Sequence, residues 1–216
     1  MIWLSLCLMP VNWMLETYKW HLLVNRFQRL SFLKSLEAVL SGLSLAMNTP
    51  NRIGEYGARV LYLEPSFRLK GVALTILCSV SQLLVTLVMG WAGLLILEPL
   101  LGGMLQQQRS SVFLLRAFTY LLLGVTILTS VFYFRMQWLV RVLRLVPWIN
   151  RRFSFAIVLE QLHGRLMLTV LLYSFLRFFV FAMQYLLLWQ ALDAQLEWWY
   201  GFWSIAVIFL VMSVIP

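Results

Sequence analysis

Several charged and amide side chains lie inside apolar runs of the sequence, and these residues could bind a ligand. Asn12, Glu16 and Lys19 are spaced by four and then three residues, which places them on one stripe of a helix face. Arg177 lies well inside a later apolar run. A charge inside a membrane costs roughly 2.5–3.5 kcal/mol on insertion scales, so each such residue needs a partner or water. We therefore expect Arg177 to face a phosphate or an acidic group, either Glu16 or Glu55. The spacing of Asn12, Glu16 and Lys19 is explained equally well by a ligand-binding role and by a simple Glu16–Lys19 ion pair near the membrane interface.

A second group of candidates follows a short apolar stretch over residues 38–47. This stretch is too short to cross a hydrocarbon core, which takes about 20 residues, and it runs into Asn48-Thr49-Pro50 with basic segments on both flanks. The pattern predicts a re-entrant hairpin over residues 36–64, which enters and leaves the membrane on the same side. Thr49 can cap a new helix that has Pro50 at its first position. The free N–H groups of that helix, with Arg52, would form an anion site for a lipid phosphate.

Charges continue downstream of this break at helical spacing. Arg52, Glu55 and Arg59 are three and four residues apart, so on a helix they can pair with one another. Gly54 and Gly57 would let another backbone come close. The alternative is a loop and a surface helix with ordinary salt bridges.

The motifs of familiar enzymes and metal sites are missing. The sequence has no nucleophile elbow, no phosphate-binding glycine loop and no paired catalytic acids. His21 and His163 are isolated, and Cys7 and Cys78 lie in apolar runs without metal-ligand spacing. We expect no catalytic residue, no metal and no cofactor, and the two histidines to be structural.

The elements that position these residues are apolar helices. Of the 216 residues 62% are hydrophobic and 12% are charged, against roughly half and a quarter in a soluble domain. We predict an all-α fold, a polytopic transmembrane helical bundle forming one integral membrane domain over residues 1–216. Both ends are apolar, so we expect a fragment of a longer protein. The predicted spans are residues 1–24, 71–97, 112–134, 166–192 and 198–215.

Basic residues predict the orientation of these spans. Thirteen Lys and Arg residues lie in segments 25–34, 52–70 and 135–165, and one lies in the opposite connections. The positive-inside rule places the basic side in the cytoplasm, which suits a multi-pass protein of a cell inner membrane. This placement explains the net charge of +9 without a nucleic-acid partner. Residues 135–153 mix arginines with apolar residues and tryptophans at helical spacing, which predicts an interfacial amphipathic helix.

Three motifs carry a resemblance to a known family. They are NWMLETYKW at 12–20, TPNRIGEYGAR at 49–59 and SFLRFFVFAMQYLLL at 174–188. In this order they resemble the flippase-like membrane family related to the transmembrane region of lysylphosphatidylglycerol synthase. The resemblance implies a helical inner-membrane domain that handles phospholipids or polyprenyl-linked lipids, by moving a headgroup between leaflets or presenting it to an enzyme.

Three functional hypotheses follow. The first is a flippase-like lipid-handling protein whose partners are membrane lipids. The second is a membrane enzyme that uses Glu16 or Glu55 as a base on a lipid-linked substrate. The third is a non-catalytic scaffold of an envelope complex, with a membrane partner or a second copy of the chain bound through its charges. The candidate lipid-binding residues are Asn12, Glu16, Lys19, Asn48, Thr49, Pro50, Arg52, Gly54, Glu55, Arg59, Arg177 and Gln184.

Overall fold

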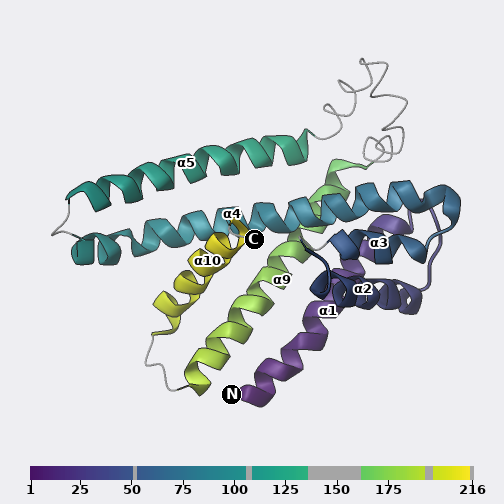
Figure 1. Ribbon diagram of the computed structural model, residues 1–216, viewed down its shortest axis with the longest axis horizontal. Helices are drawn as coiled ribbons and strands as arrows, with labels where there is room; N and C mark the ends of the chain where they lie inside the picture. The colour runs from purple at the N-terminus through teal and green to yellow at the C-terminus, as the bar shows by residue number, and fades with distance from the viewer. Residues whose placement is uncertain (51–52, 106–108, 136–161, 193–196, 215–216) are drawn as a thin grey trace. The chain divides into compact units, whose positions relative to one another are not determined.

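The described part of the chain folds entirely into helices and turns. A computed structural model describes residues 1–50, 53–105, 109–135, 162–192 and 197–214, and these contain no strand (Figure 1). The all-α prediction is therefore confirmed. The helices are α1 (Ile2–Val24), α2 (Phe32–Met47), α3 (Ile53–Leu61), α4 (Arg68–Leu105), α5 (Arg109–Phe134), α9 (Gly164–Ala191) and α10 (Trp198–Val214).

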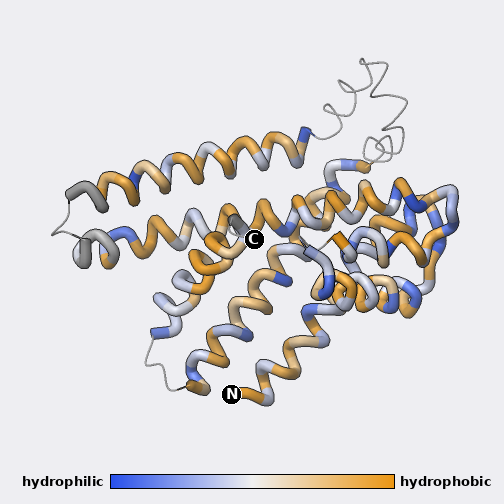
Figure 2. Tube along the Cα trace, in the orientation of Figure 1, coloured by the Kyte–Doolittle hydropathy of each residue, from blue (hydrophilic) through white to orange (hydrophobic). Residues whose placement is uncertain are grey.

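Among the described residues, three helical segments are long and apolar enough to cross a membrane. They are Pro65–Leu100, Val112–Phe134 and Gly164–Ala191. Figure 2 shows hydrophobic residues along most of α4, α5 and α9. These segments fit a membrane protein and match three of the predicted spans. Spans formed by α1, which carries Glu16 and Lys19, and by the shorter apolar α10 stay predictions.

The chain divides into two compact units. The first unit comprises Met1–Leu8, Leu83–Val131 and Phe178–Pro216, and the second comprises Met9–Gln82 and Phe132–Arg177. Helices α1, α4, α5 and α9 each contribute residues to both units.

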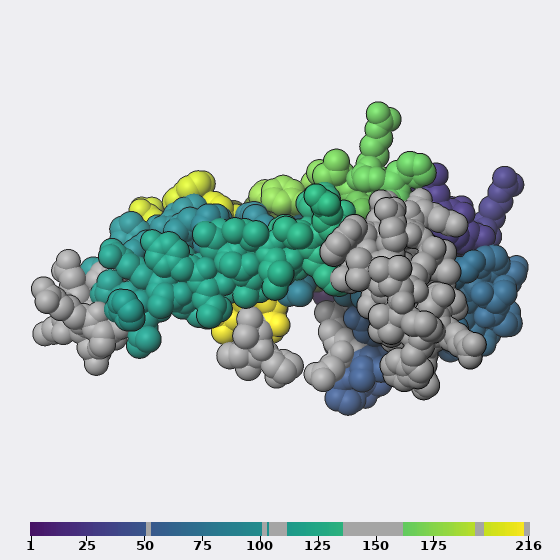
Figure 3. Space-filling model, turned by 90° about the horizontal axis from the view of Figure 1, so that it is seen from above, coloured from purple at the N-terminus to yellow at the C-terminus, as the bar shows by residue number. Residues whose placement is uncertain are grey.

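The first unit is held together by leucines from α4, α5 and α10. Leu87, Leu94, Leu122 and Leu210 form one buried cluster. Gly93 allows α4 to approach α10, because a Cβ atom there would lie 2.9 Å from the Trp203 carbonyl oxygen. The other side of α5 is uncovered in Figure 3, and only 11% of its most apolar window is buried, as expected for a surface that contacts lipid.

The second unit contains a helical hairpin made by α2 and α3, which pack together (Figure 1). Ser31 caps α2 by accepting a hydrogen bond from the Lys34 N–H. The buried residues of α2 recur every three or four positions, so one face of the helix points inward. At 1.5 Å per residue α2 is about 24 Å long and α3 about 14 Å long, so neither spans a core of about 30 Å. A hairpin is present where one was predicted, whereas its entry into the bilayer stays a prediction. The buried residues of α2 are Ser35, Ala38, Val39, Gly42 and Ala46.

The structure describes one residue of the predicted interfacial helix. Of residues 135–153 only Arg135, next to the end of α5, is described. The rest of that helix lies outside the described residues.

Candidate functional site

Glu16 is the centre of a buried ionic cluster in the second unit. Its Oε1 accepts a hydrogen bond from Arg59 Nη1 at 2.9 Å. Its Oε2 accepts from Arg177 Nη1 at 2.6 Å and from Lys19 Nζ at 2.9 Å. The carboxylate side chain is only 3% exposed. The expected acidic partner of Arg177 is therefore present, and it is Glu16. We define the ionic cluster as Asn12, Glu16, Lys19, Glu55, Arg59 and Arg177.

Helices α1, α3 and α9 supply the side chains of the ionic cluster. Asn12, Glu16 and Lys19 share one face of α1, as their spacing predicts, and all three are buried. On α3, Arg59 Nη2 donates to Glu55 Oε1, which confirms the pair expected from their four-residue spacing.

Arg177 is the most accessible cation of the ionic cluster. Its side chain is 11% exposed, against 1% for Lys19 and 0% for Arg59. Its Nε donates to Asn12 Oδ1 at 2.8 Å while its Nη1 binds Glu16, so two α1 residues orient the guanidinium. Arg177 is the cation that an incoming anion could reach most easily.

Arg59 reaches Glu16 because α2 gives it room. A Cβ atom on Gly42 would lie 3.0 Å from Arg59 Cγ and 3.2 Å from Arg59 Nε. The glycine thus lets the arginine stem lie flat against α2. This contact was not predicted from the sequence, and Gly42 in the apolar run of α2 was the only local sign of it.

Lys19 has further partners that were not predicted from the sequence. Its Nζ donates to Ser174 Oγ at 3.3 Å and to the Cys78 carbonyl oxygen at 3.4 Å. Ser174 and Ser81 share a hydrogen bond of 2.8 Å. Buried hydroxyl groups in apolar runs were the available signal, because such groups need partners.

Asn48, Thr49 and Pro50 lie in the turn between α2 and α3. Thr49 Oγ1 donates to the Leu45 carbonyl oxygen and accepts from the Gly54 N–H, both at 2.8 Å. Thr49 therefore caps the start of α3, as predicted, while Asn48 Nδ2 bonds back to α2 at Ser44.

Gly54, Gly57 and Pro50 have the roles predicted from the sequence only in part. A Cβ atom on Gly54 would lie 2.6 Å from the Leu45 carbonyl oxygen, so a close approach is present there. At Gly57 no described atom lies within 4 Å of that position, so the same expectation is wrong for Gly57. Pro50 has 3₁₀-helical conformation directly after Thr49, whereas α3 itself begins at Ile53. Arg52 lies outside the described residues.

Gln184 is the one described candidate in the first unit, whereas the ionic cluster belongs to the second. Its Nε2 donates to the Ser5 carbonyl oxygen at 3.1 Å. The structure therefore does not join Gln184 to the other candidates.

The ionic cluster contains three cations, Lys19, Arg59 and Arg177, but only two carboxylates, Glu16 and Glu55. It therefore has one surplus positive charge. Among the described residues Asn12 Nδ2 and Arg59 Nε are buried without a hydrogen-bond partner. An unsatisfied buried donor costs about 1–3 kcal/mol. Arg59 Nε is covered by Gly42, whereas Asn12 Nδ2 belongs to the side chain that orients Arg177. The arrangement suits an anionic ligand with acceptor oxygens.

The described residues contain no group of three His, Cys, Asp or Glu side chains that could hold a metal ion. His21 has a structural role, because its ring nitrogens lie 2.9 Å from Ser35 Oγ and 2.9 Å from Asn25 Nδ2. It thereby joins the end of α1 to α2.

Comparison with protein-family models, with curated proteins and with solved structures finds no match to this chain. The family resemblance of its three motifs therefore stays a prediction. The function is inferred from the site itself.

Proposed function

We propose that this chain is a flippase-like lipid-handling protein of the cell inner membrane. The ionic cluster binds the phosphate of a phospholipid or of a polyprenyl-linked lipid, and the protein moves that headgroup between leaflets or presents it to an enzyme. The observation that carries this proposal is the surplus positive charge next to the unpartnered Asn12 Nδ2 and the partly exposed Arg177.

Stability alone does not account for the ionic cluster. Replacing a buried ion network by apolar side chains is often neutral or stabilising, so such a network is weak evidence for a purely structural role. Charges within a membrane are expensive and mark substrate pathways by default. A lipid phosphate would neutralise the surplus charge and accept the hydrogen bond that Asn12 Nδ2 leaves unmade.

The α2–α3 hairpin supports the same function. Both helices are too short to cross a bilayer, and α3 contributes Glu55 from its first turn and Arg59 from its last turn to the ionic cluster. A hairpin that enters from the cytoplasmic side would bring the positive end of α3 to membrane depth, where it favours an anion.

The geometry gives less support to the alternatives. Both oxygens of Glu16 already bind cations, and the Glu55 side chain is 11% exposed and bonded to Arg59, so neither carboxylate is presented as a base. A scaffold needs charges that seek a partner helix, whereas Arg177 has its acidic partner within the same chain.

Replacing Arg177 by glutamine tests the proposal. The change removes the surplus charge while Glu16 keeps Lys19 and Arg59. A charge-assisted hydrogen bond is worth about 1.5–3 kcal/mol, so we expect lipid translocation to fall by roughly 10- to 100-fold. The measurement is the translocation of a fluorescent phospholipid in proteoliposomes.

The matched control is Arg116→Gln. Arg116 pairs with Glu98 on an exposed surface of the first unit, with a side chain 63% exposed. We expect less than about a twofold change, because exposed ion pairs are worth about 1 kcal/mol or less. Equal translocation by the folded Arg177→Gln protein and by the control would refute the proposed role of the ionic cluster.

A further inference from the structure

A second basic site lies in the second unit, where α1 ends and α9 begins. It is a pocket of about 430 Å³, and none of the residues that line it belongs to the ionic cluster. A smaller hollow of about 130 Å³ shares Arg26, His163 and Leu166 with it. The pocket is lined by Leu22, Arg26, His163, Arg165, Leu166 and Thr169.

Among the described residues, no carboxylate offsets the positive charge of the pocket. Two guanidinium groups and an imidazole line it, and its described lining contains no carboxylate. Within the described ranges of the chain, the side chains of Arg26, His163 and Arg165 form no hydrogen bond or ion pair. The site therefore differs from the ionic cluster, where every cation binds a carboxylate.

The lining changes from charged to apolar along both helices. On α1, Leu22 lies one turn before Arg26, further from the end of the helix. On α9, Leu166 and Thr169 follow Arg165 into the helix. The cations thus lie at the helix ends, and the apolar side chains lie further along the helices. The positive end of the α9 dipole and the negative end of the α1 dipole both face this region, so the guanidinium groups supply its net positive charge. This order matches a phospholipid, which has a charged headgroup above apolar chains.

We propose that this pocket binds an anionic phospholipid, with the headgroup phosphate at Arg26 and Arg165 and an acyl chain against Leu22 and Leu166. Basic pockets between membrane helices on the cytoplasmic side bind anionic headgroups. Inorganic phosphate would share the cationic contacts and leave the apolar half of the pocket unused. Binding at this pocket does not depend on translocation by the ionic cluster.

The test compares two double variants of the full chain that lose the same charge. Arg26→Gln with Arg165→Gln removes the cations of the pocket, whereas Arg29→Gln with Lys34→Gln removes two exposed cations from the same end of the second unit. The measurement is the affinity for fluorescent phosphatidylglycerol in mixed micelles of neutral detergent and phosphatidylcholine. Each cation contributes about 1 kcal/mol, so we expect binding about 30-fold weaker for the pocket variant and a change within about twofold for the control.

A second arm distinguishes the lipid from its headgroup. Unlabelled phosphatidylglycerol should displace the probe, while inorganic phosphate at the same concentration should not. Displacement by inorganic phosphate would overturn the lipid assignment. Equal affinities of two folded double variants, with folding checked by thermal unfolding, would overturn the site itself. Loss of translocation in Arg177→Gln leaves both results unchanged, so the two proposals fail separately.

Discussion

Replacing Glu16 by glutamine should destabilise the second unit more than any other neutralisation in the ionic cluster. Three cations bind this one carboxylate, so the change leaves Lys19, Arg59 and Arg177 buried together with only Glu55 to oppose them. Removing one partner of a buried ion pair costs about 3–5 kcal/mol. We expect a loss of that size in the free energy of unfolding, measured by titration with a denaturing detergent.

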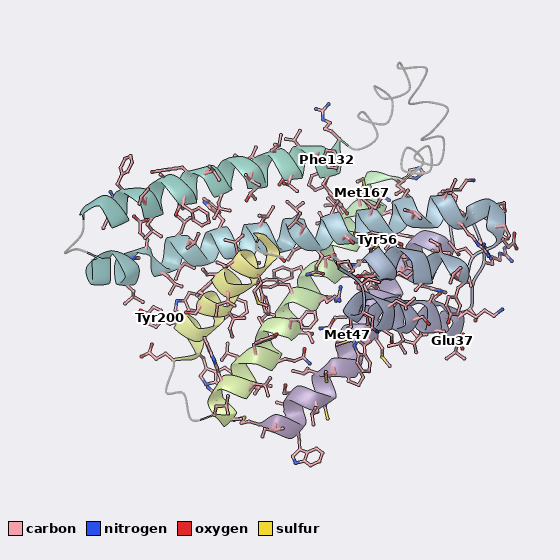
Figure 4. All side chains as sticks on the ribbon, viewed as in Figure 1. Glu37, Met47, Tyr56, Phe132, Met167 and Tyr200 are labelled. Atoms are coloured by element: carbon pink, nitrogen blue, oxygen red, sulfur yellow. The ribbon has the colours of Figure 1, made fainter. Side chains whose placement is uncertain are left out.

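Glu37 provides the matched control for this prediction. It is an exposed glutamate on α2, labelled in Figure 4, and it is not a member of the ionic cluster. Glu37→Gln should change the free energy of unfolding by about 0.5 kcal/mol or less, as surface substitutions usually do. A double variant with both Glu16→Gln and Arg59→Gln should regain part of the lost stability, because it removes a cation together with the carboxylate. Similar stabilities for Glu16→Gln and Glu37→Gln would contradict the described cluster.

Replacing Gly54 by alanine should disrupt the turn of the α2–α3 hairpin. The new Cβ atom would lie 2.6 Å from the Leu45 carbonyl oxygen and 2.7 Å from Thr49 Oγ1. Both atoms belong to the hydrogen bonds that cap α3, so the cap must shift. Overpacking costs about 1–3 kcal/mol, and we expect a loss in that range in the free energy of unfolding.

Replacing Gly57, one turn further along α3, by alanine should instead raise the free energy of unfolding. No described atom lies within 4 Å of its Cβ position, so alanine meets no described neighbour there. Alanine is better than glycine inside a helix by about 0.5–1 kcal/mol, and we expect Gly57→Ala to stabilise the protein by about that amount. The same unfolding titration measures both variants. Equal effects of the two substitutions would contradict the close approach at Gly54.

The spacing of residues along the chain predicted those side-chain groups of the site that lie on a single helix. The Glu55–Arg59 pair and the stripe of Asn12, Glu16 and Lys19 follow from helical spacing. The cost of a charge inside an apolar run predicted a phosphate or an acidic partner for Arg177, with Glu16 and Glu55 as candidates, and the structure places Glu16 there. Long apolar runs also predicted where most of the long helices lie, whereas α4 continues through Glu98 and Pro99 to Leu105, past its predicted end at residue 97.

The contact between Arg59 and Glu16, which joins α3 to α1, could not be predicted in this way. Arg59 reaches Glu16 because Gly42 of a third helix leaves space, and spacing along the chain contains no such information. The two glycines of α3 are three residues apart, so they point in directions that differ by about 60°, and Gly54 alone meets α2.

A structure determined in a phosphatidylglycerol bilayer tests the central claim most directly. The claim is that the surplus positive charge of the ionic cluster binds a lipid phosphate. We expect a phosphate oxygen at hydrogen-bond distance, about 2.7–3.2 Å, from Asn12 Nδ2 and from the Arg177 guanidinium. An intact cluster that is sealed from lipid, with no phosphate within reach of either side chain, would contradict it.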